Sequence, residues 1–204
     1  MWRGQGLGMP YSMKPKPSGQ PEAAAAVPVS GVRAVFLVGF MGAGKTSVGR
    51  VLSQKLGWLF EDLDDRIQAR EQRSIEQIFQ QSGESAFRSM EQAALRSLIG
   101  ELSASPPRIV ALGGGAFAQA GNAALLDEAG FFAIFLDAPV EELFRRCQVQ
   151  GLQRPLRRDL QRFRQLYETR RPCYLKAALR IETGGKEVEK VAAEVISCLR
   201  LEAT

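Results

Sequence analysis

Short apolar runs alternate with stretches of helical periodicity along most of this chain. The first run, residues 34–38, is entirely apolar, as expected of a strand buried on both faces. Between the runs, apolar residues recur every three or four positions, which predicts amphipathic helices. The runs predicted to be strands are residues 34–38, 58–62, 108–115, 131–137 and 179–183. This alternation predicts an α/β fold with a parallel sheet covered on both faces, so ligands are expected at the carboxyl ends of the strands.

Start and stop signals bracket several of the helical stretches. Gly57 follows the apolar stripe that begins at Val48 and is typical of a helix end. Residues 74–77, SIEQ, form a capping box, and Pro139 is typical of a first helical turn. The stripes are assigned to the core, and they contain Val48, Val51, Leu52, Leu56, Phe87, Met90, Ala94, Leu95, Leu98, Val140, Leu143, Phe144, Val188, Val191, Ala192, Val195 and Leu199.

A glycine-rich segment, GFMGAGKT at residues 39–46, joins the first predicted strand to the first predicted helix. It fits the pattern G-x-x-x-x-G-K-[ST], whose glycines let backbone N–H groups wrap phosphate oxygens at close approach. In this pattern Lys45 brings a positive charge to the β- and γ-phosphates, and the Thr46 hydroxyl reaches Mg²⁺. A glycine-rich turn with an unrelated lysine is the alternative, and the strand before and helix after disfavour it. The segment predicts a site for a nucleoside triphosphate.

Composition limits the class of protein and excludes several kinds of catalytic and metal-binding site. The 204 residues suit one domain, and a hydrophobic fraction of 45% is enough for a core. The absence of histidine excludes histidine-based triads, metal sites and general bases. Cys147, Cys173 and Cys198 lack disulfide or metal spacing, which suits a reducing, cytoplasmic location. No apolar run approaches the roughly 20 residues of a membrane helix.

The first 30 residues differ in composition from the rest. They are rich in Pro, Gly, Ser and Ala, and they lack the apolar core of a secretory signal. We expect residues 1–30 to be a disordered extension of a single domain at residues 31–204. An upstream start codon would account for such an extension, and a targeting peptide is the less favoured alternative.

The net charge of +5 is concentrated late in the sequence. Residues 153–172, QRPLRRDLQRFRQLYETRRP, are rich in arginine, which serves either nucleic-acid binding or a lid over anionic substrates. The aromatic residues of this run do not form the stacking platform that single strands need. The pattern therefore favours the lid, and no nucleic-acid partner is expected.

Motifs near the predicted strand ends and on one helix offer further site residues. Asp62 and Asp64 are two apart, so on an extended strand end they would face one side, where paired carboxylates hold Mg²⁺ and a hydroxyl. The acidic start of a solvated helix is an equal alternative. Residues 113–115, GGG, would let a ligand touch the backbone, or they form a flexible loop. Arg88 and Glu91 lie on neighbouring helical turns, a spacing most common for surface ion pairs.

Taken together, these motifs resemble the shikimate kinase family over residues 33–204. They occur in family order as GFMGAGKT, DLD, IFQQSGESAFRSME, LGGGA, RPL and RRPCY. The resemblance implies the three-layer sandwich of P-loop kinases with a five-stranded parallel sheet, a substrate-binding helical segment at about 62–95 and a lid at about 147–165. The lid departs from the family pattern, because residues 154–170 are a few positions short and include Arg157 and Arg158.

The resemblance also implies a role for each matching residue. For ATP it implies Gly42, Ala43, Gly44, Lys45, Thr46, Ser47, Arg146 and the lid arginine Arg154. For shikimate it implies Asp64, Arg88, Gly113, Gly114, Gly115 and Arg170, and for one Mg²⁺ ion it implies Thr46 and Asp62. Lys45, Asp64 and Arg154 would be catalytic, with Asp64 either orienting or deprotonating the attacking hydroxyl. These roles are coherent, because arginines bind carboxylates bidentately and a lid arginine suits charge developing on a phosphoryl group.

The implied activity is ATP-dependent phosphorylation of the 3-hydroxyl of shikimate, giving shikimate 3-phosphate and ADP, a step of chorismate and aromatic amino acid biosynthesis. The implied enzyme is a cytoplasmic monomer without a membrane partner. Two alternatives stay open. A kinase for another polyol acid, such as gluconate, shares the P-loop but does not need both Arg88 and the glycine triplet. A catalytically inactive relative that binds a partner would have lost a phosphate or acceptor residue, and none of those named above is missing.

Overall fold

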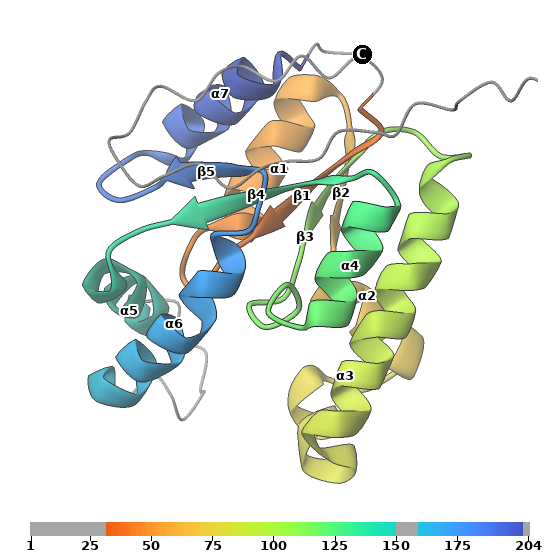
Figure 1. The fold of residues 1–204 in the computed structure, drawn as a ribbon, viewed down its shortest axis with the longest axis vertical. Helices are drawn as coiled ribbons and strands as arrows, with labels where there is room; N and C mark the ends of the chain where they lie inside the picture. Colours follow the sequence, from red (N-terminus) through yellow and green to blue (C-terminus); the bar gives the residue numbers. More distant parts are fainter. Residues whose placement is uncertain (1–31, 150–158, 202–204) are drawn as a thin grey trace, which may run out of the picture.

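Five parallel strands form the central sheet of the computed structural model, which describes residues 32–149 and 159–201 (Figure 1). The strands are β1 (Ala34–Val38), β2 (Leu59–Asp62), β3 (Arg108–Ala111), β4 (Phe132–Asp137) and β5 (Leu179–Glu182). Their order across the sheet is β2-β3-β1-β4-β5, and every neighbouring pair is parallel. The predicted sheet is therefore confirmed, and β1, which leads into the glycine-rich loop, lies at its centre.

Helices cover both faces of the sheet. Within the described residues they are α1 (Lys45–Leu56), α2 (Leu63–Glu71), α3 (Ile75–Leu102), α4 (Ala120–Glu128), α5 (Val140–Val149), α6 (Leu160–Tyr174) and α7 (Val188–Leu199). α1 and α7 pack together on one face, and α3 and α4 lie on the other (Figure 1). α2 packs on α3, and α5 packs on α6 near the end of β4. The predicted three-layer sandwich is confirmed.

The ends of these elements follow local chemistry that is visible in the sequence. α1 ends at Gly57, which adopts the left-handed conformation with φ 70°. The capping box at the start of α3 is confirmed, because the Ser74 side chain accepts from the Gln77 N–H and the Gln77 side chain accepts from the Ser74 N–H. The apolar stripes of the helices lie in the core or against it. The sequence pattern thus predicted the frame correctly.

A break in α3 divides the helix beside the sheet end. Gly83 has φ 78° and ψ 174°, a conformation that only glycine adopts without strain. The part before the break carries Ile75 and Phe79, and the part after it carries Arg88 and Glu91. The break lets one continuous segment present side chains to a shared space from two directions.

Two features of the fold were not predicted. Strand β3 ends at Ala111, before the glycine triplet, so residues 113–115 belong to the turn that follows the strand. Helix α6 occupies much of the arginine-rich run for which a lid was favoured, and Pro172 lies in its last turn. Its buried stripe of Phe163, Tyr167 and Tyr174 was the available signal, and the arginines between these residues obscured it.

Several predictions fall on residues outside the described ranges. The disordered extension at 1–30 and the lid arginine Arg154 are among them, as are Arg157 and Arg158. The described ends of the predicted lid, residues 147–149 and 160–165, are helical parts of α5 and α6. Among the described residues, no helix is both long and apolar enough to cross a membrane.

Candidate active site

The glycine-rich loop turns tightly between β1 and α1 and is backed by α5. Gly39, Gly42 and Gly44 all have positive φ, and Gly44 is the residue that precedes the first turn of α1. A Cβ on Gly42 would lie 2.5 Å from the Leu143 carbonyl oxygen and 2.9 Å from the Cys147 sulfur. Both the backbone conformation and the contact with α5 therefore require glycine at this position.

Lys45 and Thr46 reach across the loop from the start of α1. The Lys45 ammonium donates to the carbonyl oxygens of Gly39 and Phe40, at 3.0 Å each. The Thr46 hydroxyl donates to Asp62 Oδ2 at 3.0 Å, which joins the loop to the end of β2. Ala43 is buried within the loop, and Ser47 is exposed at the first turn of the helix. The loop therefore presents a cation, a hydroxyl and a carboxylate at the carboxyl edge of the sheet.

Asp62 and Asp64 do not share an extended strand end, so that geometric prediction was wrong. Strand β2 stops at Asp62, which caps α2 by accepting the Asp64 N–H at 3.1 Å, and Asp64 lies in the first helical turn. An aspartate that can cap a helix ends the strand there. Asp64 nevertheless points toward the glycine triplet, since its Oδ1 lies 2.6 Å from where a Cβ on Gly113 would be.

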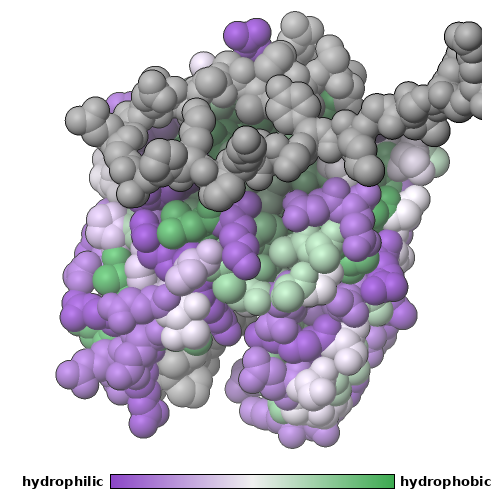
Figure 2. Space-filling model, viewed as in Figure 1, coloured by the Kyte–Doolittle hydropathy of each residue, from purple (hydrophilic) through white to green (hydrophobic). Residues whose placement is uncertain are grey.

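A cavity of about 700 Å³ opens next to the glycine-rich loop. Figure 2 shows the cleft on this face, between α6 and the part formed by α2 and α3, with a largely hydrophilic rim. Met41 of the glycine-rich loop forms part of its wall. The residues predicted for the acceptor all line this one cavity, namely Asp64, Arg88, Gly113, Gly114, Gly115 and Arg170. Residues distant in the sequence thus meet beside the loop.

Arg88 projects into the cavity from α3 between two carboxylates. It donates to Glu91 Oε2 at 2.9 Å and to Glu84 Oε1 at 3.1 Å. Its Nε is buried and has no hydrogen-bond partner among the described residues. Burial lowers the pKa of Arg88, but the charges and hydrogen bonds of the two glutamates outweigh this and leave it raised. Arg88 therefore stays cationic and retains a donor for a further acceptor group.

The alternative of a surface ion pair between Arg88 and Glu91 does not hold for Glu91. Its exposed fraction is only 1%, and it lines the floor of the cavity. Burial raises the pKa of its carboxyl, and the Arg88 charge opposes this only in part. The pairing with Arg88 is therefore an interaction of the site and of the core together.

Arg88→Ala is expected to destabilise the fold more strongly as pH rises. Without Arg88, an ionised Glu91 would be buried without its cation, at a cost of roughly 1–3 kcal/mol, whereas a protonated Glu91 avoids that cost. The pKa of Glu91 is higher in the folded protein than in the unfolded chain. Its contribution to the free energy of unfolding is therefore fully present below the ordinary carboxyl pKa, and it is lost as pH rises through the raised pKa. The melting-temperature gap between variant and wild type is measured at several pH values. A gap independent of pH would contradict this prediction, and Arg96→Ala, at an exposed position of α3, is the control.

Arg170 reaches the cavity from α6. It donates to the Gly114 carbonyl oxygen at 3.3 Å, and the Tyr174 hydroxyl donates to the same oxygen. Burial raises the pKa of Tyr174 to about 12, so its hydroxyl remains a donor at neutral pH. A Cβ on Gly115 would lie 2.7 Å from the Arg88 guanidinium. The glycine triplet is thus packed directly between the charged side chains of the cavity.

The next arginine, Arg171, points elsewhere. It donates to Asp137 Oδ2 at 3.1 Å and to the Tyr167 hydroxyl at 3.0 Å, and the Tyr167 hydroxyl donates to Asp137 Oδ1. Asp137 is 2% exposed at the end of β4 and also accepts from Arg180. This cluster fixes α6 against the sheet, and sequence reasoning did not identify it.

Arg146 lies behind the glycine-rich loop rather than in the cavity. Its guanidinium donates to the Thr183 carbonyl oxygen at 2.7 Å, to Glu142 at 2.6 Å and to the Gly42 carbonyl oxygen at 3.5 Å. Arg146 thus joins the loop to α5 and to the end of β5. α6 also contributes to the cavity wall residues that sequence reasoning missed, namely Arg162, Gln165, Leu166 and Thr169.

Comparison with known proteins decides the family. The shikimate kinase family matches residues 41–200. The chain belongs to the shikimate kinase family. A shikimate kinase from Persephonella marina is 36% identical over 83% of this chain and 100% of its own length. One from Geobacter metallireducens is 42% identical over 83% of this chain and 93% of its own.

Solved structures of shikimate kinases agree in fold. The Acinetobacter baumannii shikimate kinase in complex with shikimate has a TM-score of 0.72 and 33% identity over 80% of this chain and 90% of its own. Family membership makes this chain an enzyme, a kinase that phosphorylates shikimate with ATP. The glycine-rich loop is hereafter called the P-loop, and the cavity lies next to it.

Proposed function

We propose that the cavity binds shikimate and the P-loop binds ATP, so that the 3-hydroxyl is phosphorylated to give shikimate 3-phosphate and ADP. The observation that carries this proposal is the meeting of Asp64, Arg88 and Arg170 in one cavity whose wall includes the P-loop residue Met41. Shikimate has one carboxylate and three hydroxyls. The cavity lining offers the arginines Arg88, Arg162 and Arg170, the carboxylates Asp64, Glu84 and Glu91, and the backbone of the glycine triplet. The product would serve chorismate and aromatic amino acid biosynthesis.

In this proposal each side of the cavity meets a different part of shikimate. Arg88 and Arg170 bind the carboxylate, because guanidinium groups match its geometry. Asp64 and the backbone of Gly113, Gly114 and Gly115 bind the hydroxyls. The position of the Arg88 guanidinium at the cavity wall supports the first assignment, since a cation there favours an anionic ligand. The substrate-binding segment is accordingly residues 62–95.

The proposed ATP site is formed by the P-loop and the residues next to it. The backbone of Gly42, Ala43 and Gly44 and the side chain of Lys45 bind the phosphates, and Ser47 and Arg146 lie further along the nucleotide. The oxygens of Thr46 and Asp62, 3.0 Å apart, fit one Mg²⁺ ion, which prefers oxygen ligands and is usually held by one or two protein groups together with phosphates. When bound, the ion would neutralise charge on the phosphate oxygens.

Catalysis then comes mainly from positioning and electrostatics. Asp64 holds the attacking hydroxyl in line with the terminal phosphate, and it either orients this hydroxyl or accepts its proton. Lys45 stabilises charge on the phosphates as it shifts. We assign Arg154, in a lid at residues 147–165, to the transferring phosphoryl group.

We also propose that the enzyme is a monomer, because a single chain supplies all the residues of the cavity. The proposed location is the cytoplasm, which fits three cysteines without disulfide spacing.

Release of ADP with and without an acceptor tests the proposal. We expect release to depend on shikimate and to be at least about tenfold slower with gluconate. The open chain of gluconate must be ordered before its carboxylate and a hydroxyl can reach Arg88, Arg170 and Asp64 together, whereas the shikimate ring is already rigid. Phosphorus NMR of the product identifies which hydroxyl carries the phosphate. Equal rates with both acceptors would contradict the assignment of the acceptor, and release without any acceptor would reduce the protein to an ATPase.

Gly113→Ala is expected to lower kcat/KM for shikimate by about tenfold to a hundredfold with little loss of stability. The added Cβ would lie 2.6 Å from Asp64 Oδ1, so this carboxylate must move, and a displacement of about 1 Å in an active site can cost a hundredfold in rate. The movement is cheap for the fold, because only the end of a side chain shifts. Steady-state kinetics and the melting temperature measure the two effects.

Gly121→Ala, at the start of α4 and outside the cavity lining, is the matched control for this substitution. Its added Cβ would lie 2.5 Å from the end of the Gln92 side chain, so a side chain must also move there, but not one that lines the cavity. We expect kinetics within about threefold of wild type. If both variants lost activity equally, the displacement of Asp64 would not be the cause.

A further inference from the structure

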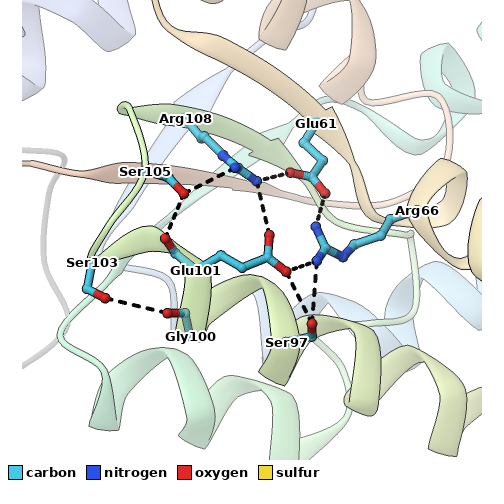
Figure 3. A network of polar contacts seen from close by, with 8 residues as sticks. All are labelled: Glu61, Arg66, Ser97, Gly100, Glu101, Ser103, Ser105 and Arg108. Carbon is cyan, nitrogen blue, oxygen red and sulfur yellow. Dashed lines mark hydrogen bonds and ion pairs between the residues drawn. The ribbon is translucent and has the colours of Figure 1, made fainter.

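The short segment that carries both site aspartates is flanked by charged residues that face away from the site. Asp62 and Asp64 lie at the junction of β2 and α2, and Glu61 and Arg66 stand on either side of them. Because side chains alternate along a strand, Glu61 projects from the face opposite to Asp62. Figure 3 shows Arg66 between Glu61 and Glu101 of α3, and Arg108 of β3 next to the same two glutamates.

These four side chains form a closed ring of ion pairs. Arg66 donates to Glu61 Oε1 at 2.5 Å, and Arg108 donates to Glu61 Oε2 at 2.6 Å. On the other side, Glu101 pairs with Arg66, and its Oε2 lies 3.6 Å from the Arg108 guanidinium. Glu61 is 19% exposed and Glu101 is 41% exposed, so the Glu61 side of the ring is better shielded from water. Glu61 alone links β2, α2 and β3.

The ring matters because α2 has little apolar packing of its own. Within this nine-residue helix the buried residues are Leu63 and Ile67. Arg66 lies between them in sequence and ties the helix to Glu61 of β2 and to α3. A further link at the junction is the cap from Asp62, whose other oxygen accepts from Thr46. The orientation of both site aspartates therefore depends on how Arg66 is held.

We propose that Glu61 is a positioning residue, which through Arg66 and Arg108 sets the β2–α2 junction so that Asp62 faces the P-loop and Asp64 faces the cavity. A neutral glutamine at this position keeps the shape but places an amide NH₂ against two guanidinium donors. Arg66 would then form its ion pair with Glu101 alone, and α2 would be free to shift relative to β2. The inference rests on the proposed function for the roles of the two aspartates.

Glu61→Gln and Glu101→Gln form a matched pair of tests. Each removes one carboxylate from the same two arginines, but only Glu61 belongs to the strand that leads into the site. We expect Glu61→Gln to lower kcat/KM for shikimate about tenfold, and to weaken the binding of Mg²⁺·ADP and of shikimate in calorimetry by about threefold or more. We expect Glu101→Gln to keep all three values within twofold of wild type, although the melting temperature falls in both variants. Glu61→Asp, which retains the carboxylate, should recover part of the loss.

The outcomes separate a positioning role from a merely structural one. Wild-type kinetics in a folded Glu61→Gln variant would overturn the proposal, as would equal kinetic losses in Glu61→Gln and Glu101→Gln. If Glu61→Gln did not fold, Arg66→Gln would open the same link from the α2 side, and the expectation is identical. Turnover of shikimate by the wild-type enzyme tests the proposed function independently, so that failure of the ring proposal leaves that function standing.

Discussion

Lys45→Ala is expected to abolish measurable turnover, a loss on the order of a thousandfold, while the protein stays folded. In the proposed mechanism Lys45 brings positive charge to the β- and γ-phosphates, and contacts that strengthen as charge shifts in the transition state contribute strongly to catalysis. The ammonium donates to the Gly39 and Phe40 carbonyl oxygens, so it lies across the P-loop.

The fold should survive this substitution with a small loss of stability. Two hydrogen bonds within the loop disappear, at about 1 kcal/mol each, which lowers the melting temperature by several degrees. Lys55→Ala, at an exposed position in the last turn of the same helix, is the control and should leave kcat unchanged. Circular dichroism establishes folding, and ADP release gives the rate. Near-wild-type activity of Lys45→Ala would end the P-loop assignment.

Arg88→Ala and Arg170→Ala are expected to raise the KM for shikimate about tenfold to a hundredfold each. A hydrogen bond between charged groups is worth about 1.5–3 kcal/mol, and each substitution removes one proposed donor to the substrate carboxylate. The KM for ATP should change much less, because neither residue belongs to the P-loop. If only the KM for ATP changed, that arginine would be assigned to the nucleotide site instead.

The two arginines differ in their other interactions within the protein. Arg170 donates to a backbone carbonyl oxygen that Tyr174 also satisfies, so its removal is the cleaner test of substrate binding. Arg88 also neutralises the buried Glu91, and its variant must be assayed well below its own melting temperature. Arg96→Ala, on the exposed side of α3, should leave both KM values unchanged. A decrease in shikimate KM on removing either site arginine would contradict the proposed roles.

Much of the fold could be predicted because its signals are local. The apolar runs, the glycines with positive φ at the P-loop and the capping box of Ser74 and Gln77 each act within a few residues of sequence. The strand order and the two faces of the sheet then follow from packing these elements. Helix α6 was missed because its three buried aromatic residues are separated by many arginines, and local composition outweighed their spacing.

The site was predictable in its residue types and less so in its geometry. Two alternatives were open for Asp64, an extended strand end and the acidic start of a helix. Asp64 lies at the start of a helix, because the capping bond of Asp62 ends β2 two residues earlier. A surface ion pair was the alternative for Arg88 and Glu91, since a spacing of three along a helix does not tell which way the helix faces. The burial of Glu91 depends on the tertiary placement of α3 beside the glycine triplet, where Arg88 approaches Gly115.

By itself, the sequence determined that this chain is an α/β protein with a phosphate-binding loop and a supply of acidic and basic side chains at the strand ends. Only the tertiary structure decided where the successive arginines of α6 point. Each residue of a helix turns by about 100° from the last, so Arg170 meets the Gly114 carbonyl at the cavity while Arg171 meets the buried Asp137. That choice depends on where β4 and the glycine triplet lie around α6, and these segments are brought there by the sheet rather than by neighbouring residues.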